Sequence, residues 1–139
     1  MDRMRAISLI QADRRRGFTL IELMITVAIV AILTAIAFPI YSAAMMKGRR
    51  GDAESTLMDI AQRQQQYLLD VRAYAPDAAT LNVTIPASVS AFYTIAIAAT
   101  TGTPPTFTAS ATPIIGTPQA GDVTLMIANT GAKTPSGVW

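Results

Sequence analysis

The chain has 139 residues, of which 51% are hydrophobic and only 14% are charged, and it contains neither histidine nor cysteine. The lack of both residues excludes the commonest general base, thiol chemistry and most transition-metal sites, so no catalytic residue, metal site or cofactor is predicted. The formal net charge of +2 is unevenly divided, because residues 1–17 carry +3 and the remaining residues carry −1. The basic balance therefore belongs to the first segment and does not indicate a nucleic-acid partner.

An apolar segment of membrane length follows this basic head, which ends in Arg14, Arg15 and Arg16. From Leu23 to Tyr41 the chain has 19 residues without a charge. As a helix this stretch is about 28 Å long, close to the thickness of a hydrocarbon core. The sequence therefore predicts a transmembrane helix. Basic residues that flank a span tend to stay cytoplasmic, so we expect residues 1–17 on the cytoplasmic side and the residues after the span on the other side.

The helical pattern continues beyond the apolar segment, and we predict one long helix over about residues 18–74. Its second half has polar residues on one face and a stripe at helical spacing on the other. A stripe of this kind must cover something, and a sheet formed by the rest of the chain is the obvious candidate. The stripe consists of Ala53, Leu57, Ile60, Ala61, Gln64, Leu68 and Val71.

Pro39 lies inside this predicted helix. Proline lacks the N–H that would bond the carbonyl of Ala35 and crowds that carbonyl, so we expect a kink or local opening near residues 35–39. Gly48 and Gly51 weaken the helix further, each by about 1 kcal/mol relative to alanine.

After residue 74 the pattern changes to a connecting loop up to about residue 91, followed by short alternating segments. Strands are predicted over residues 92–99, 106–112 and 123–127, with a turn at 129–131 and a last short strand at 132–134. The fold class is therefore α+β, a long helix packed against three or four antiparallel strands. The residues expected to face the helix are Tyr93, Ile95, Ile97, Phe107, Ala109, Ala111, Val123, Leu125 and Ile127.

The motif Gly17-Phe18-Thr19-Leu20-Ile21-Glu22, preceded by three arginines, resembles the class III signal peptide of type IV pilins and related pseudopilins. Close similarity covers about residues 14–74, and weaker similarity continues to Trp139. The resemblance implies that a membrane-embedded prepilin peptidase cuts between Gly17 and Phe18 and methylates the new Phe18 amine. It divides the chain into a leader (1–17), a transmembrane and assembly helix (18–41) and a pilin lobe (42–139).

The resemblance also implies a function. The chain would be a substrate of enzymes and not an enzyme. It would be anchored in the inner membrane by one span with a cytoplasmic N-terminus, in contact with lipid, and then drawn by the pilus assembly machinery into an extracellular filament with other pilin subunits. Such filaments support twitching motility, adhesion or DNA uptake. Nucleic acid is not expected as a partner of this chain, because the lobe offers only Arg63, Arg72 and Lys133 beyond the cluster that follows the span.

Glu22 is the one carboxylate at the edge of the apolar segment, where an ion needs a partner. Cleavage would leave a positively charged amine on Phe18. Opposite charges attract strongly in a low dielectric, although desolvation offsets much of the gain. We hypothesise that Glu22 pairs with the Phe18 amine of an adjacent subunit during assembly. The simpler interpretation is a glutamate at a helix start, stabilised by the helix dipole and water.

Three alternatives remain open at this point. The chain could be a type II secretion pseudopilin, or a membrane-tethered domain that never polymerises. It could also be secreted after cleavage behind Ala35-Ile36-Ala37, a small-x-small pattern. The basic cluster of Lys47, Arg49 and Arg50 is expected at anionic headgroups, or against Asp52 or Glu54 of a neighbour. The lack of cysteine departs from the disulfide-closed C-terminal loop of many pilins and leaves open what replaces it.

Overall fold

The computed structural model of the chain describes residues 17–139. The predicted leader, including Arg14, Arg15 and Arg16, lies outside the described residues. The chain divides into two compact units, Met1–Phe38 and Pro39–Trp139, which are described separately below. We call the second unit the lobe.

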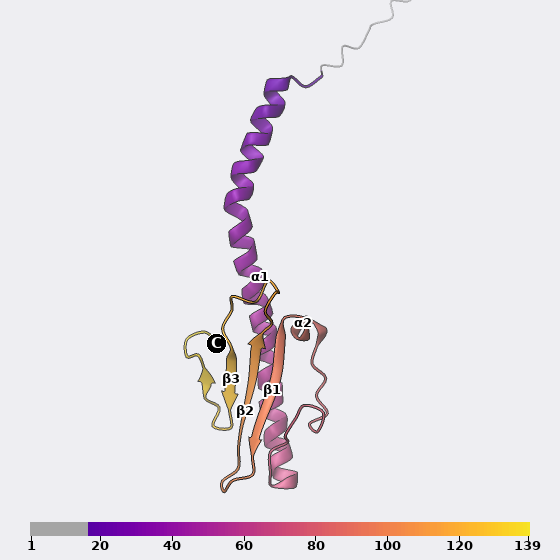
Figure 1. Cartoon of the computed structure of the whole chain (residues 1–139), viewed down its shortest axis with the longest axis vertical. Coiled ribbons are helices and arrows are strands. Elements are labelled where there is room, and N and C mark those ends of the chain that lie inside the picture. Colours follow the sequence, from indigo (N-terminus) through magenta and orange to yellow (C-terminus); the bar gives the residue numbers. More distant parts are fainter. Residues whose placement is uncertain (1–16) are drawn as a thin grey trace, which may run out of the picture. The chain divides into compact units, whose positions relative to one another are not determined.

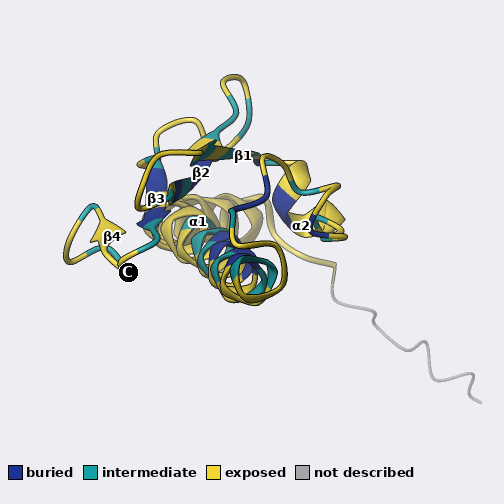
Figure 2. Ribbon diagram, turned by 90° about the horizontal axis from the view of Figure 1, so that it is seen from below, coloured by how far each residue is buried: buried dark blue, intermediate teal, exposed yellow. Residues whose placement is uncertain are grey.

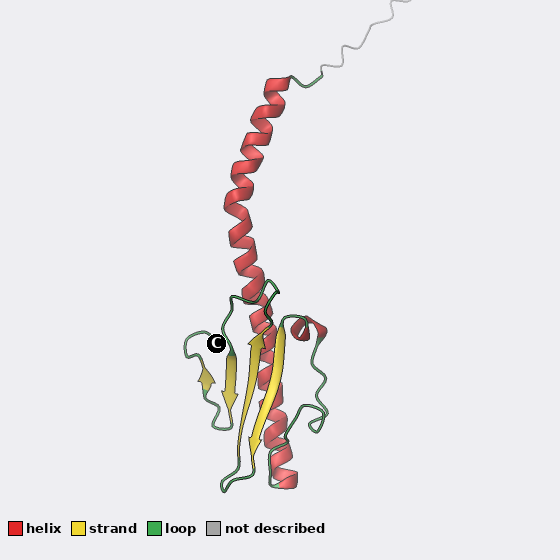
Figure 3. Cartoon of the chain, in the orientation of Figure 1, coloured by secondary structure: helices red, strands yellow, loops and turns green. Residues whose placement is uncertain are grey.

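A single helix, α1 (Leu20–Val71), confirms the prediction of one long helix (Figure 3). It begins behind Thr19, whose hydroxyl oxygen accepts a hydrogen bond from the Glu22 backbone N–H at 3.2 Å, the bond of an N-cap. It ends before Arg72, which has a φ of +60° and donates its N–H to the carbonyl of Leu68 at 2.8 Å. This left-handed residue stops the helix three residues earlier than predicted. Pro39 lies inside α1, and the kink expected there stays a prediction.

The lobe contains a four-stranded antiparallel sheet in the order β1-β2-β3-β4 (Figure 1). Its strands are β1 (Tyr93–Thr100), β2 (Thr106–Pro113), β3 (Leu125–Ala128) and β4 (Lys133–Thr134). The connecting segment before β1 carries one short helix, α2 (Ala87–Ser90). The turn between β3 and β4 is closed by the Gly131 N–H, which donates to Ala128 O at 2.9 Å. Gly131 has a φ of +80°, which an L side chain rarely adopts.

The core of the lobe lies between α1 and the sheet (Figure 2). The predicted stripe supplies the fully buried Ala53, Leu57, Ile60 and Gln64. The sheet supplies the other side of the core, with Tyr93, Phe107, Ala109, Ala111, Leu125 and Ile127.

Two expected core positions are wrong. Val71 is 51% exposed because it is the last residue of α1, and Val123 is 37% exposed because β3 begins only at Leu125. Several core positions were missed: Tyr74, Ala75, Leu81 and Val89 after α1, Gln119 before β3, and Thr56 in α1 itself are also buried. For Thr56 the polar group has a partner inside the helix. Its hydroxyl donates to the carbonyl of Asp52 at 2.9 Å, which satisfies the polar group within the helix.

Gln64 fastens the connecting segment to α1. Its side-chain amide donates to the carbonyl of Ala75 and accepts from the Ala75 N–H, both at 2.8 Å and both buried. Next to this pair, the rings of Tyr74 and Phe107 pack edge to face with centroids 4.7 Å apart. A polar residue in the stripe is therefore explained by the backbone groups that it satisfies where the chain turns back from α1.

Candidate functional site

The residues predicted for processing and assembly lie together at the start of α1. One shallow surface pocket is lined by Gly17, Phe18, Thr19 and Glu22. Phe18 is 86% exposed. Within residues 17–139 the ion pairs are Arg50–Asp122 and Arg63–Asp59, so Glu22 has no charged partner in this part of the chain. The arrangement leaves a carboxylate and the proposed cleavage point side by side and accessible.

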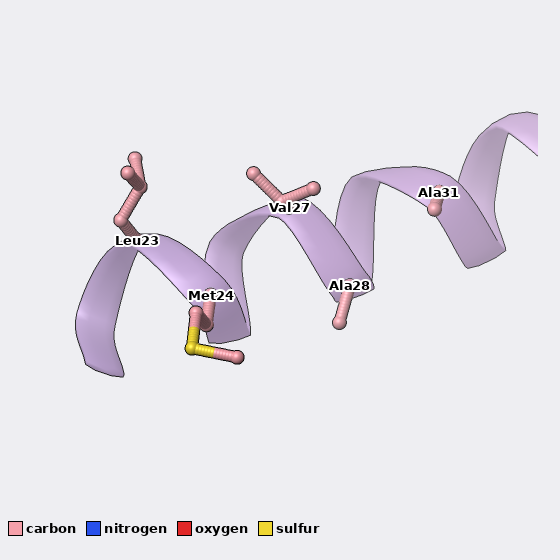
Figure 4. A pocket seen from close by; sticks show the side chains of 5 residues that line it. All are labelled: Leu23, Met24, Val27, Ala28 and Ala31. Carbon is pink, nitrogen blue, oxygen red and sulfur yellow. The ribbon is translucent and has the colours of Figure 1, made fainter. Parts of the chain in front are cut away.

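A groove follows along the next turns of the helix (Figure 4). Its lining is apolar throughout, and Ala28 and Ala31 keep its floor low. Small residues allow the backbones of two helices to approach closely, so the groove can accept another helix in an apolar environment. The lining residues are Leu23, Met24, Val27, Ala28 and Ala31.

The first half of α1 also meets the requirements of a membrane span. Among residues 17–139, α1 is the one helix long and apolar enough to cross a bilayer. The hydroxyls of Thr26 and Thr34 donate back to the carbonyls of Glu22 and Val30, at 2.7 and 2.8 Å. These bonds satisfy both hydroxyls inside the helix, which lowers the free energy of placing them in lipid.

The lobe holds a second polar group of residues that the sequence analysis did not find. Asp122, from the loop before β3, accepts hydrogen bonds from Arg50 of α1 and from the Tyr93 hydroxyl of β1. Gln119 donates from its side-chain amide to Asp122 at 2.7 Å and to the carbonyl of Met46 at 3.1 Å. We call Arg50, Tyr93, Gln119 and Asp122 the polar clasp, because they tie the loop before β3 to α1.

The electrostatics of the polar clasp follow from its burial. The side chain of Asp122 is fully buried, while that of Arg50 remains 25% exposed. Burial raises the pKa of Asp122, but the hydrogen bonds from Arg50 and Tyr93 outweigh it and lower the pKa to about 2. Burial and the bond to Asp122 raise the pKa of Tyr93. The clasp is therefore a permanently ionised pair at neutral pH with a structural role.

Two of the three residues in the basic cluster after the span contact other residues of the lobe. Arg50 is bound in the polar clasp, and the Arg49 guanidinium carbon lies 4.2 Å from the centroid of the Phe92 ring, a cation–π contact. Lys47 is exposed. The sequence analysis expected all three at headgroups or against a neighbour's acids, and it missed these partners because they lie far away along the chain.

The C-terminus is held without a disulfide. Trp139 is half-buried and packs against the core, and its indole N–H donates to the carbonyl of Thr134 at 3.2 Å. The Lys133 ammonium lies 4.8 Å from the centroid of the Trp139 ring.

A long helix, apolar in its first half and packed in its second half on an antiparallel sheet, defines the pilin class of proteins. A solved type IV pilin from Shewanella oneidensis has the same fold, with a TM-score of 0.53 over 68% of this chain and 97% of that chain. At 22% identity this likeness supports the fold alone.

Two family models match the sequence. One is described as the prokaryotic N-terminal methylation motif and matches residues 13–38. The other is described as type IV minor pilin ComP, DNA uptake sequence receptor, and matches residues 39–123, more than half of the chain. The chain therefore belongs to this type IV pilin family.

Curated relatives agree with this assignment. The type IV major pilin protein PilA of Myxococcus xanthus is 39% identical over 45% of this chain and 28% of its own length. The type IV wide pilus major component PilA4 of Thermus thermophilus is 38% identical over 48% of this chain and 50% of its own length. The alignments thus span half or less of these relatives, whose names describe a major pilin and a major pilus component.

Proposed function

We propose that the chain is a filament subunit of a type IV pilus, cut by prepilin peptidase between Gly17 and Phe18 and assembled through the first half of α1. One observation carries this proposal. Large apolar side chains from Leu20 to Tyr41 are exposed all around the helix, and none of the described residues 17–139 covers them. Lipid before assembly and other subunits after it would provide the missing contacts.

Processing is tested by the mass of the mature chain. If the peptidase acts as proposed, the protein recovered from the membrane starts at Phe18 and carries one additional methyl group. Replacing Gly17 by glutamate should leave the full-length precursor in the membrane. Recovery of a soluble chain that starts after Ala37 would show ordinary secretion instead and would overturn the proposal.

Glu22 is proposed to pair with the Phe18 amine of an adjacent subunit. Packing two subunits at an offset that leaves the carboxylate unpaired in apolar surroundings is unfavourable. Pairing of Glu22 would therefore fix the axial offset between neighbouring subunits. The exposed position of Glu22 next to Phe18 supports this role.

The test compares Glu22→Val with Asp70→Val, which removes an exposed carboxylate from the lobe half of the same helix. Glu22→Val should insert into the membrane at the normal level but yield no sheared filaments. Asp70→Val should assemble normally. A normal filament yield from Glu22→Val would refute the pairing, and poor membrane insertion of the variant would show that Glu22 acts before assembly.

DNA uptake is the second candidate, favoured by the family model that covers residues 39–123. The charge of the lobe does not favour it, because its basic residues are matched by as many acidic ones and Arg50 and Arg63 are already paired. Fluorescence anisotropy of labelled duplex DNA with full-length protein in detergent decides the question. Salt-dependent binding that weakens in Arg72→Gln and Lys133→Gln would support a DNA-receptor role. The remaining candidate roles are twitching motility, adhesion and pseudopilus-driven secretion. The phenotype of a strain that lacks this chain distinguishes among them.

A further inference from the structure

Ile115, in the loop between β2 and β3, is the most exposed large apolar side chain among residues 17–139, at 93%. It lies at one corner of a tight turn, in which the Thr117 N–H donates to the carbonyl of Ile114 at 3.3 Å. The other corner residue, Gly116, has a φ of +86°, which favours glycine. A single exposed apolar residue is common on proteins, so its surroundings must decide whether it has a partner.

The loop is fastened to α1 at the end of the apolar stretch of that helix. Gln119 donates to the carbonyl of Met46 at 3.1 Å, and Asp122 pairs with Arg50 in the polar clasp. Figure 1 shows the loop at the end of the lobe where α1 enters it. All of these residues belong to the lobe unit, so the loop and residues 46–50 of α1 form one arrangement.

A second set of contacts holds the start of the loop. The Ile114 N–H donates to the carbonyl of Phe92 at 2.9 Å, and the Arg49 guanidinium lies 4.2 Å from the centroid of the Phe92 ring. Arg49 and Arg50 are adjacent, so both ends of the loop are tied to the same turn of α1. The position of Ile115 relative to this turn is thus fixed from two sides.

This turn of α1 lies at the level of lipid headgroups when the first half of the helix spans a membrane. The uncharged stretch that begins at Leu23 continues past Tyr41 to Met46, and Lys47 is the first charged residue after it. Met46 is about 7.5 Å beyond Tyr41 along the helix axis. The polar layer on each side of the hydrocarbon core is about 5–7.5 Å thick. A tyrosine followed by a lysine at this depth is typical of a membrane interface.

We propose that the loop between β2 and β3 is a second membrane contact of the unassembled chain, with Ile115 inserted at the boundary between headgroups and acyl chains. The inference rests on the proposed membrane anchoring of α1 and adds a contact made by the lobe. Lys47, which is exposed beside the attachment point of the loop, would contact anionic headgroups. The contact would hold the lobe against the bilayer before assembly and would be released when the chain enters a filament.

Size and charge favour lipid over a protein as the partner of this loop. A stable protein interface needs about 800 Å² on each side, whereas an apolar side chain enters lipid without a matching surface. The loop has no charge from Pro113 to Gly121, and the next residue, Asp122, is fully buried and paired with Arg50. The first acid of α1 after the span, Asp52, lies about 9 Å beyond Met46. Among the described residues, this end of the lobe thus presents a cation to an anionic surface and keeps its acid away.

Depth-dependent fluorescence quenching tests the contact, and the lack of native cysteine allows one label per chain. Full-length chains with Ile115→Cys, Thr101→Cys or Ala31→Cys are labelled with an environment-sensitive fluorophore. They are reconstituted into vesicles of phosphatidylcholine and anionic phosphatidylglycerol, with nitroxide quenchers on the headgroups or on the acyl chains. Thr101 is the matched control, because it is exposed in the turn at the other end of β2, a strand about 26 Å long.

The expected result is quenching of the Ile115→Cys label by headgroup nitroxides and a blue shift of its emission, with neither at Thr101→Cys. Quenching of Ala31→Cys by acyl-chain nitroxides shows that the span is inserted. If Ala31→Cys is quenched and Ile115→Cys behaves like Thr101→Cys, the loop contact is wrong and the membrane anchor stands. No quenching of Ala31→Cys would overturn the anchor and the contact together.

The role of Ile115 itself is tested with a label that leaves this residue in place. Ala120 is exposed on the same loop, and headgroup quenching of an Ala120→Cys label is expected. Adding Ile115→Ser should reduce this quenching, whereas adding Ile115→Leu should preserve it. Equal quenching in the two variants, including none in either, would overturn the proposal. Shielding of the label in sheared filaments but not in vesicles would also overturn it and would assign the loop to a neighbouring subunit.

Discussion

The two halves of α1 are one helix with two different surfaces. In the first unit the side chains of the helix are exposed on every side and almost all apolar. In the lobe the same helix is divided into a polar side and a stripe that is buried down to 0% exposure at Ala53, Leu57 and Ile60. Both halves are thus helical, and they differ only in how apolar residues are distributed over their surfaces. This distribution indicates where the packing partner of each half comes from.

The comparison shows how one element serves two purposes. The lobe half finds its partner within the chain, in strands β1, β2 and β3. The first half finds none among residues 17–139, and an apolar surface of that size is not stable in water. The proposed function supplies partners for this surface, namely lipid before assembly and other chains after it.

The largest expected effect on lobe stability comes from truncating a leucine in the buried half of α1. The matched control truncates a leucine in the exposed half. Leu57→Ala should lower the free energy of unfolding of the lobe by about 2–5 kcal/mol, because it leaves a cavity in a closed core. Leu33→Ala removes the same atoms from an exposed position and should leave lobe stability unchanged. Urea unfolding of the full-length protein in detergent, followed by the fluorescence of Trp139, measures both variants. A comparable loss in Leu33→Ala would mean that the halves are not energetically distinct.

The next largest effect is expected from the polar clasp. Asp122→Ala leaves Arg50 and the Tyr93 hydroxyl without their acceptor, and we expect a loss of about 2–3 kcal/mol, moderated because Arg50 is partly in water. The control Asp59→Ala removes an exposed pair with Arg63 and should change stability by less than about 1 kcal/mol. Equal losses from the two variants, measured by the same urea unfolding, would show that the clasp adds nothing beyond a surface ion pair.

The pH dependence of the free energy of unfolding should also depend on Asp122. The pKa of Asp122 is lowered in the folded chain from its ordinary 3.8 to about 2, so the unfolded chain binds this proton more tightly. Its contribution of about 2 kcal/mol is therefore complete above about pH 5 and is lost as the pH falls through 3.8 towards 2. Unfolding curves between pH 2 and pH 6 should show this slope in the natural chain. In Asp122→Asn the slope should shrink, and an unchanged slope would assign it to other carboxylates.

Sequence reasoning recovered the parts of this structure that are periodic. The helix, the faces of the strands and most of the stripe follow from spacing alone, and the family follows from the motif around Gly17. The polar clasp could not be predicted, because Arg50 and Asp122 are 72 positions apart and an arginine near a span is equally suited to a headgroup. Only the loop before β3 brings the carboxylate back to α1. The roles of Gly17, Phe18 and Glu22 stay predictions.

The smallest expected effect concerns the segment of α1 between the two surfaces. Gly51 is exposed inside the helix, and a Cβ added there would meet nothing within 4 Å. Gly51→Ala should therefore raise the free energy of unfolding of the lobe by about 1 kcal/mol, since glycine is the poorer helix former. The same unfolding experiment measures it, with Ala44→Gly as the reverse change.

A stabilised variant that still forms filaments would mean that Gly51 has no role in packing between subunits. A stabilised variant that fails to assemble would show that another chain approaches the helix closely there. The surface that faces other chains would then extend past the apolar half, and the division of α1 into two surfaces would need to be moved towards the lobe.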